Sequence, residues 1–498
     1  MDTSELRNTL KKYGQEHLLH HWDSINDKER SQLIQSLSGM NWESITKSFE
    51  RSISSMDEGG KMDDRMTPLS PDQCASLKDT SDILKEEYKC TAYKAMKEGQ
   101  LAILLVAGGQ GTRLGVSYPK GMYSVGLESN KSLFQLQAER ILKLEQLSEG
   151  KIPLYVMGSH NNLETTRNFF TEHSFFGLNP DWVVFFSQGT YPCFSLDGKV
   201  LLSSKFEVAR ASNGNGGLYE ALRDCKIIED MESRKVKYIQ LYCVDNILVR
   251  VGDPFFTGYC IKEGAECANK VVAKSYPSET VGITCKVDGA YQVVEYSEIT
   301  DKAAEQRNPD GSLTYGLANL CIHFFSLAFL SKVSNELDGE LEFHVAKKKI
   351  PFVNEEGVLI KPEKPNGVKL EKFVFDVFRF AKDFVIWECI REDEFAPLKN
   401  APGASSFSPE HCKMALYALN QKMILEAGGV LVDLEDNPVP KMQSPAAPLN
   451  CNGSSDTKND TCVQIEISPL VSYSGEGLEE LVKGRRITVP VYINDKDF

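Results

Sequence analysis

The chain has 498 residues, of which 25% are charged, and its formal net charge is −14. This length is sufficient for two or three domains with a large core, whereas the acidic balance argues against nucleic acid or an anionic membrane surface as a partner. No run of the sequence reaches the roughly 18 apolar residues that a membrane-spanning helix needs, so we expect neither membrane nor nucleic-acid binding.

Residues 1–98 are predicted to form a helical N-terminal section. Apolar residues recur at helical spacing between Leu6 and Ile53. The stretch Met56–Asp79 is richer in Gly, Asp, Ser and Pro and is predicted to be a connection. A further helix over Ser81–Glu98 then leads to the next element.

A glycine-rich loop follows the apolar run Leu101–Val106, which is typical of a buried parallel strand. Glycines adopt backbone angles closed to other residues, so successive N–H groups can converge on an anion, and nearby cations add full positive charge. The glycines are Gly108, Gly109 and Gly111, and the cations are Arg113 and Lys120. The loop therefore predicts a phosphate-binding site.

Two familiar phosphate loops fit this stretch poorly. Gly109-x-Gly111 begins a dinucleotide fingerprint, but Leu114 stands where its third glycine belongs. The nucleoside-triphosphatase loop requires Gly-Lys followed by Ser or Thr, and none of the Gly-Lys pairs meets this requirement. A plain strand-to-helix turn stays open as the alternative.

The central part of the chain, residues 99–400, alternates strand-like and helical segments. Ser132, with Gln135 three residues later, predicts a capping box that opens a helix reaching about Glu149. Further strands are predicted at Pro153–Met157, Val183–Phe186 and Tyr238–Val244, and further helices at Asn161–Thr171 and Gly217–Glu232. This alternation indicates an α/β parallel sheet, in which Gly108, Gln188 and Asp245 follow strands and should gather on one rim.

Residues 401–498 are predicted to form a small C-terminal α+β domain. A helix near Pro409–Ala427 is followed by short strands and by a Pro-, Asn- and Ser-rich loop at Pro445–Asp460. The thirteen cysteines form no paired Cys-x-x-Cys motif, and the N-terminus is acidic and polar. Reduced thiols and a cytoplasmic location are therefore expected. Core packing is expected for Cys225, Cys243, Cys267 and Cys285.

The sequence around the glycine loop resembles the signature of eukaryotic UDP-N-acetylhexosamine pyrophosphorylases. Ordered blocks along most of the chain carry the likeness, and they are Ala107–Gly115, Tyr118–Gly121, Gln188-Gly189, Asn213–Gly217, Tyr242–Asn246, Val294–Glu298, Lys361–Asp376, Arg391–Asn400 and Gly475–Leu478. The resemblance implies a Rossmann-like, mixed and mostly parallel sheet of the nucleotidyltransferase type. It also implies UTP and an N-acetylhexosamine 1-phosphate as substrates, with Mg²⁺, or alternatively Mn²⁺, as cofactor.

The same resemblance assigns roles to individual residues. Arg113, Lys120 and Lys399 would be catalytic cations. Nucleotide contacts would come from Ala107, Gly108, Gly109, Gly111, Gln188, Gly214, Asp245 and Lys369. Sugar contacts would come from Asn215, Gly282, Glu295, Tyr296 and Asn319, and Asp245 would ligate the metal.

Each assignment has a plainer interpretation in the sequence alone. Asp245 could cap the following helix, and Asn246 could serve as a ligand or as a cap. Gln188 could be an ordinary polar residue. Glu295 and Tyr296 lie at the end of the strand-like Tyr291–Tyr296. Glu295 could be a solvated charge, and Tyr296 could be a packing residue.

The sequence departs from the family pattern at Gly316–Asn319, where the family usually has Asn-Ala-Gly-Asn. The added bulk is expected to reshape the acetamido pocket. Similarly, Ser212-Asn213 replaces a Pro-Asp-like pair, which is expected to loosen that loop. Two other functions stay open: a pyrophosphorylase of plain hexose 1-phosphates, and a UDP-sugar-binding relative with weak catalysis. Oligomeric state is not indicated.

Overall fold

The computed structural model describes residues 3–58, 62–445 and 463–494. It contains two compact units. The first comprises Met1–Lys61, Gln188–Asp224 and Val333–Val377, and the second comprises Met62–Ser187, Cys225–Lys332 and Phe378–Phe498. The three-part division at residues 98 and 400 stays a prediction.

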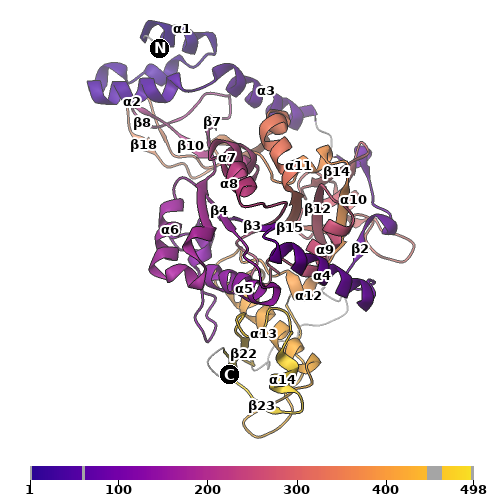
Figure 1. The fold of residues 1–498 in the computed structure, drawn as a ribbon. Coiled ribbons are helices and arrows are strands. Elements are labelled where there is room, and N and C mark those ends of the chain that lie inside the picture. Colours follow the sequence, from indigo (N-terminus) through magenta and orange to yellow (C-terminus); the bar gives the residue numbers. More distant parts are fainter. Residues whose placement is uncertain (1–2, 59–61, 446–462, 495–498) are drawn as a thin grey trace. The chain divides into compact units, whose positions relative to one another are not determined.

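The second unit is built on a mixed sheet (Figure 1). Four adjacent strands run parallel in the order β11 (Tyr238–Cys243), β3 (Leu101–Val106), β4 (Leu154–Gly158) and β5 (Val183–Ser187). On the other side of β11, the antiparallel β15 (Leu317–Ser326) leads to β12 (Cys267–Ala273), β20 (Phe384–Glu388) and β2 (Ala75–Ser76). β13 (Ile283–Val287) pairs with β15, with β14 (Ala290–Val294) and with β1 (Met66–Thr67). The predicted fold class is confirmed.

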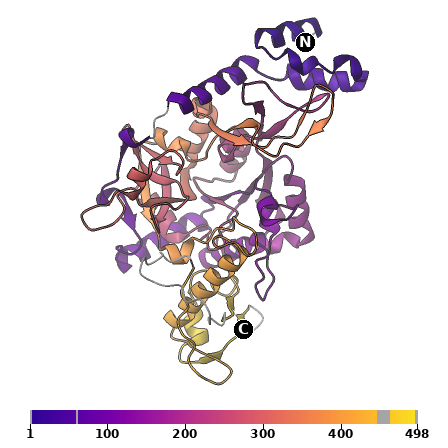
Figure 2. The ribbon, with the colours of Figure 1, turned by 180° about the vertical axis from the view of Figure 1, so that it is seen from behind.

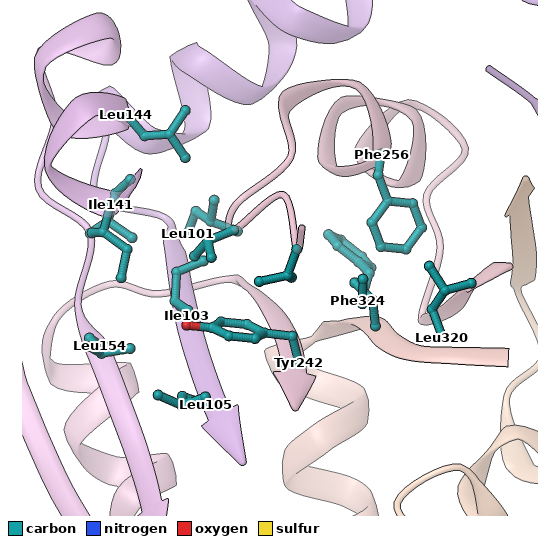
Figure 3. Packing of buried hydrophobic residues seen from close by; sticks show 14 of the residues in the cluster. Leu101, Ile103, Leu105, Ile141, Leu144, Leu154, Tyr242, Phe256, Leu320 and Phe324 are labelled. Atoms are coloured by element: carbon teal, nitrogen blue, oxygen red, sulfur yellow. The ribbon is translucent and has the colours of Figure 1, made fainter. Parts of the chain in front are cut away.

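The core of this sheet forms around β3, all six residues of which are buried, as its apolar sequence predicts. Figure 3 shows Leu101 and Ile103 of β3 packed near Ile141 and Leu144 of α5 (Leu133–Ser148). Other members come from α4 (Asp82–Lys97), α6 (Leu163–Glu172) and α9 (Pro254–Lys262). Each fully buried aliphatic side chain contributes about 1.5–3 kcal/mol, so the strand that delivers the glycine loop is held rigidly.

Several sequence predictions are corrected within single elements. Ser132 Oγ does accept the Gln135 N–H at 3.2 Å, but the Gln135 amide donates to Glu139 and closes no capping box. The helix predicted over residues 217–232 is two helices, α7 (Leu218–Asp224) and α8 (Ile227–Ser233), broken where Lys226 has φ 55°. The connection over residues 56–79 includes β1, β2 and the end of α3 (Trp42–Glu58).

The cysteine predictions are confirmed only in part. Cys267 and Cys285 are buried, as expected for core packing. Cys225 is exposed at the break between α7 and α8, so its assignment to the core is wrong. Cys243 is half-buried, because it is the last residue of β11 and borders the end of the sheet.

The first unit carries the predicted N-terminal helices α1 (Thr3–Lys12), α2 (Asp27–Ser38) and α3. Their apolar side chains share one core with the short strands of the same unit. Those strands include the antiparallel set β16 (His344–Lys348), β19 (Gly367–Glu371) and β7 (Phe194–Ser195), labelled in part in Figure 1. The helical N-terminal section therefore packs on strands that come from much later in the chain.

The end of the chain contains α13 (Pro409–Glu426), which confirms the predicted helix, and α14 (Leu478–Val482). Four short strands, β21 (Val430–Val432), β22 (Ile465–Ile467), β23 (Arg486–Thr488) and β24 (Val491–Ile493), form two parallel pairs. Figure 2 shows these orange and yellow elements together. The predicted loop at residues 445–460 lies, apart from Pro445, outside the described residues. No helix of the described chain is long and apolar enough to cross a membrane.

Candidate active site

The glycine loop is closed by its own backbone. Lys120 N–H donates to the Gly109 carbonyl at 3.3 Å, and Gly111 N–H donates to the Tyr118 carbonyl at 3.1 Å. Ala107 N–H donates to Met157 of β4 at 2.8 Å, which fixes the start of the loop on the sheet. Within the described chain, the N–H groups of residues 108, 109 and 110 make no hydrogen bond. These three donors are therefore available to an anion.

The glycines of this loop serve different purposes. A Cβ atom at Gly111 would lie 2.3 Å from Val116 Cγ2, so the loop's own packing requires glycine there. A Cβ atom at Gly109 would meet nothing within 4 Å. Gly109 is exposed, so the space beside it is open to a ligand.

Lys120 and Asp245 face each other beside the loop. The Lys120 ammonium lies 3.8 Å from Asp245 Oδ2, and the two side chains are only 15% and 22% exposed. Asp245 follows β11 and Gly108 follows β3, and these neighbouring strands run parallel, with Val244 N–H donating to the Val106 carbonyl at 3.1 Å. The structure thus brings Gly108, Lys120 and Asp245 to one rim of the sheet. Arg113 is exposed on the same loop.

Lys399 is brought to this rim by a segment far away in sequence. Leu398 N–H donates to the Asp245 carbonyl at 2.8 Å, which places Lys399 directly beside the end of β11. The Asn246 amide strengthens this connection: its Nδ2 donates to the Glu394 carbonyl at 2.6 Å, and its Oδ1 accepts the Ala396 N–H at 3.0 Å and the Leu248 N–H at 3.2 Å.

Asn246 is the functional residue that the sequence left undecided. Its side chain is 4% exposed, and its amide is committed to three backbone groups. It therefore positions Lys399 and is not placed to bind a metal. The only local signals were its place after Asp245 and its bond with Leu248, because its other two partners lie about 150 residues later.

A buried charge cluster includes Glu394, which belongs to the segment that leads to Lys399. Lys270 bridges Asp253 and Glu394, and all three side chains are at most 1% exposed. Burial alone would lower the pKa of Lys270, but the two carboxylates outweigh it and raise this pKa. Burial, together with the charge of Asp253, raises the pKa of Glu394, and Lys270 opposes that rise.

Three of the predicted sugar contacts meet elsewhere in the second unit. Asn319 N–H donates to the Gly282 carbonyl at 2.9 Å. A Cβ atom at Gly282 would lie 3.0 Å from Glu295 Oε1, so the missing side chain leaves room against this carboxylate. β14 ends at Val294, so Glu295 and Tyr296 lie in the following turn and not in a strand; Tyr296 is 50% exposed.

The remaining predicted contacts, Gln188, Gly214, Asn215 and Lys369, belong to the first unit. Gly214 has φ +84°, and a Cβ atom there would lie 2.2 Å from the Lys372 carbonyl. Asn215 Oδ1 accepts the Val374 N–H at 3.0 Å, which holds the loop against the segment after β19, the strand that carries Lys369. Gln188 is buried and directly follows β5 in the chain.

The loop before Gly214 is held more firmly than its sequence suggests. Asn213 is 2% exposed, its Nδ2 donates to Glu220 at 3.1 Å, and its carbonyl accepts the Lys372 N–H at 2.8 Å. Glycine at position 217 leaves space for the Asn213 side chain, since a Cβ atom there would lie 1.9 Å from Asn213 Oδ1. That this loop is looser than one with a Pro-Asp pair stays a prediction.

The acidic residues limit how a metal could be bound. In the described part of the chain, no three His, Cys, Asp or Glu side chains converge as a metal cage. Mg²⁺ is commonly held by one or two carboxylates together with substrate phosphates and water. Among the described residues, the carboxylate of Asp245 lies beside a loop with three unbonded N–H groups, and this arrangement fits that mode.

Comparisons with known proteins identify the family of the chain. Residues 42–434 match the family described as UTP–glucose-1-phosphate uridylyltransferase. The chain is 46% identical to human UDP-N-acetylhexosamine pyrophosphorylase-like protein 1, over 99% of this chain and 97% of that protein. It is 36% identical to the UDP-N-acetylglucosamine pyrophosphorylase of Saccharomyces cerevisiae, over 95% of each.

A solved structure extends the likeness to the fold. The uridine diphosphate N-acetylglucosamine pyrophosphorylase of Trypanosoma brucei matches with a TM-score of 0.79 and 28% identity, over 98% of this chain and 97% of that chain. The strand order, the glycine loop and the full-length identity lead to the same conclusion. This chain belongs to the UTP–glucose-1-phosphate uridylyltransferase family and, within it, to the UDP-N-acetylhexosamine pyrophosphorylases.

Proposed function

We propose that this protein transfers the uridylyl group of UTP to an N-acetylhexosamine 1-phosphate. The products are UDP-N-acetylglucosamine, or UDP-N-acetylgalactosamine, and pyrophosphate, and the reaction is reversible. The names of its full-length relatives support this reaction. The observation that carries it is the placement of Lys120 3.8 Å from Asp245, beside a loop whose successive N–H groups make no hydrogen bond to any residue that the structure describes.

This reaction requires alignment of the two substrates and neutralisation of their phosphate charges more than it requires proton transfer. The attacking oxygen of the sugar phosphate is already an anion, so it needs no general base. It attacks the α-phosphorus of UTP in line, and the bond to the pyrophosphate breaks. N–H groups of the loop and the ammonium of Lys120 would hold the triphosphate, and the guanidinium of Arg113 would stabilise charge on the departing pyrophosphate.

Further residues would orient the two substrates. Lys399, held beside Asp245 by the Asn246 connection, would neutralise a phosphate oxygen. In the first unit, Gln188 would read the uracil edge, and Gly214 and Lys369 would contact the nucleotide. Asn215 would contact the sugar, as would Asn319 and the turn that holds Glu295 and Tyr296. The space at Gly282 would receive the N-acetyl group.

Asp245 would hold Mg²⁺, or Mn²⁺ as an alternative, together with the substrate phosphates. The ion would supply neutralisation of phosphate charge. A cytoplasmic location is part of the same proposal, because the cysteines of the described residues form no disulfide.

A pyrophosphate-release assay with UTP and a panel of sugar 1-phosphates tests the proposal. We expect turnover with N-acetylglucosamine or N-acetylgalactosamine 1-phosphate and much less with glucose 1-phosphate. Lys120→Met should lower kcat/KM by about 10²–10³-fold. Lys143→Met is the matched control, because among the described residues that ammonium donates to Gln146 alone, on the exposed surface of α5.

Two outcomes would contradict this function. Preferred turnover of glucose 1-phosphate would favour a pyrophosphorylase of plain hexose phosphates. Calorimetric binding of UDP-N-acetylglucosamine, without pyrophosphate release from UTP in the presence of any sugar phosphate, would favour a binding protein.

A further inference from the structure

Two thiols meet at the end of the central sheet. Cys243 is the last residue of β11, and Cys321 lies in the neighbouring antiparallel strand β15. Their Sγ atoms are 3.3 Å apart, and both residues are half-buried. No other two cysteine sulfurs are hydrogen-bonded to each other in the described chain.

The backbone of β15 is irregular where it carries Cys321. Opposite β12, Lys270 pairs with Ile322, whereas the next residue, Val271, pairs with Asn319, so two residues of β15 bulge out of the pairing. Cys321 is one of them, with φ 57°, a left-handed conformation that is uncommon outside glycine. Asn319 Oδ1 accepts the Cys321 N–H at 2.9 Å and stabilises this shape. Bulges commonly redirect a side chain, and here the redirected thiol faces Cys243.

Each of the two thiols is close in sequence to a residue that the proposed reaction uses. Cys243 precedes Asp245 by two residues, and Cys321 follows Asn319 by two residues. If the two sulfurs move toward each other, the backbone next to Asp245, which would bind the phosphates, and next to Asn319, which would bind the sugar, must therefore move as well.

We propose that Cys243 and Cys321 are a modification site, at which a hydroperoxide forms a reversible disulfide that slows turnover. In the first step, one thiol attacks the peroxide, the O–O bond breaks, and a sulfenic acid and water form, with hydrogen peroxide as the simplest case. The second thiol then displaces the hydroxyl group as water and forms the S–S bond. The thiols lose two electrons and two protons, and the peroxide is reduced.

The geometry allows this bond with a small movement. Tyr242 and Ile322, the residues next to Cys243 and Cys321, pair across the two antiparallel strands. Such pairs have Cα atoms about 4.5–5.5 Å apart, within the range of about 4.4–6.8 Å found for disulfides. The sulfurs must approach from 3.3 Å to about 2.05 Å, a shift of about 1.2 Å. Misplacement of reacting groups by about 1 Å costs up to about 100-fold in rate. The effect on turnover rests on the proposed function, whereas formation of the bond does not.

Peptide mass spectrometry under non-reducing conditions tests the bond directly. The full chain is treated with a small excess of hydrogen peroxide and digested after the remaining thiols are blocked. We expect a linked peptide containing Cys243 and Cys321, lighter by two hydrogen atoms than the sum of its parts. The link should persist in the control Cys90→Ala, which removes an exposed thiol, and should be absent from Cys321→Ala.

Pyrophosphate release, measured on the same samples, tests the consequence. Peroxide should lower turnover of the wild-type protein at least 10-fold, dithiothreitol should restore it, and Cys321→Ala should resist the treatment. Cys243→Ser gives the same test with the bulge intact, should Cys321→Ala fail to fold.

The outcomes separate the two proposals. Absence of the linked peptide, while exposed thiols are oxidised, overturns the modification site. A linked peptide with unchanged turnover overturns the regulatory effect. A linked peptide in a chain that shows no turnover even when reduced supports the modification site and contradicts the proposed reaction.

Discussion

Replacing Asn246 by Ala should uncouple Lys399 from the end of β11. In the native protein, the Asn246 amide makes three hydrogen bonds, two of them to the segment that leads to Lys399. The third is accepted from the Leu248 N–H. Alanine keeps the backbone but removes all three bonds at a position that is 4% exposed.

The magnitude follows from those bonds. Each net hydrogen bond contributes about 1 kcal/mol, so the free energy of unfolding should fall by about 3 kcal/mol, and by more where a buried backbone group stays unsatisfied. If the ammonium of Lys399 is then misplaced, the transition state should lose a further stabilisation of about 3 kcal/mol, which corresponds to about 100-fold in kcat/KM.

Urea unfolding and pyrophosphate release measure the two effects separately. Asn420→Ala is the matched control: Asn420 is equally buried at 4% exposed, but its amide donates at 3.1 Å to Ile465 near the end of the chain. This control should lose about 1 kcal/mol of stability and keep its kcat/KM. Wild-type kcat/KM in folded Asn246→Ala would refute the positioning role.

Three further predictions concern the rest of the molecule. Lys270→Met removes the ammonium that bridges the buried Asp253 and Glu394, leaves Glu394 only Arg250 at 3.9 Å among the described cations, and should lower the free energy of unfolding by about 3–5 kcal/mol. Burial already raises the pKa of Glu394 and Lys270 opposes that rise, so without Lys270 this carboxyl should bind its proton more tightly in the folded chain; urea unfolding should then show a smaller loss at about pH 5 than at about pH 8, and an equal loss would contradict this. Gly214→Ala should raise the Kd for UTP at least 10-fold, since its Cβ atom would lie 2.2 Å from a backbone carbonyl; Gly99→Ala, with φ +69° but nothing within 4 Å, should not. Ala318→Gly should change the ratio of kcat/KM for N-acetylglucosamine and N-acetylgalactosamine 1-phosphates, and an unchanged ratio would rule out an effect of this side chain.

The sequence was most informative where the structure is local. The apolar run at 101–106 matches β3 residue for residue, because a strand that is buried on both faces consists of consecutive apolar residues and can be recognised from its own sequence. The break between α7 and α8 was missed, because the left-handed residue there is Lys226, which carries no glycine or proline signal. The end of β14 before Glu295 was missed for a similar reason: Val293, Val294 and Tyr296 suit a strand equally well.

The arrangement of the site depended on long-range pairing, which local patterns do not contain. The resemblance named Lys399 and Asp245, but the bond from Leu398 to Asp245 and the role of Asn246 come from a segment folded back across about 150 residues. The meeting of Cys243 with Cys321 is equally non-local, because it depends on the bulge in β15.

The open space beside Gly109 has a practical consequence for interpreting sequence variants. An alanine there would meet no atom of the protein within 4 Å, and such a change often raises stability by about 0.4–1 kcal/mol by restricting the unfolded chain. If the proposed phosphate site is correct, a variant of this kind would express, purify and melt like the wild-type protein while its methyl group would occupy the place of a phosphate oxygen. Screens that score abundance alone would classify it as harmless.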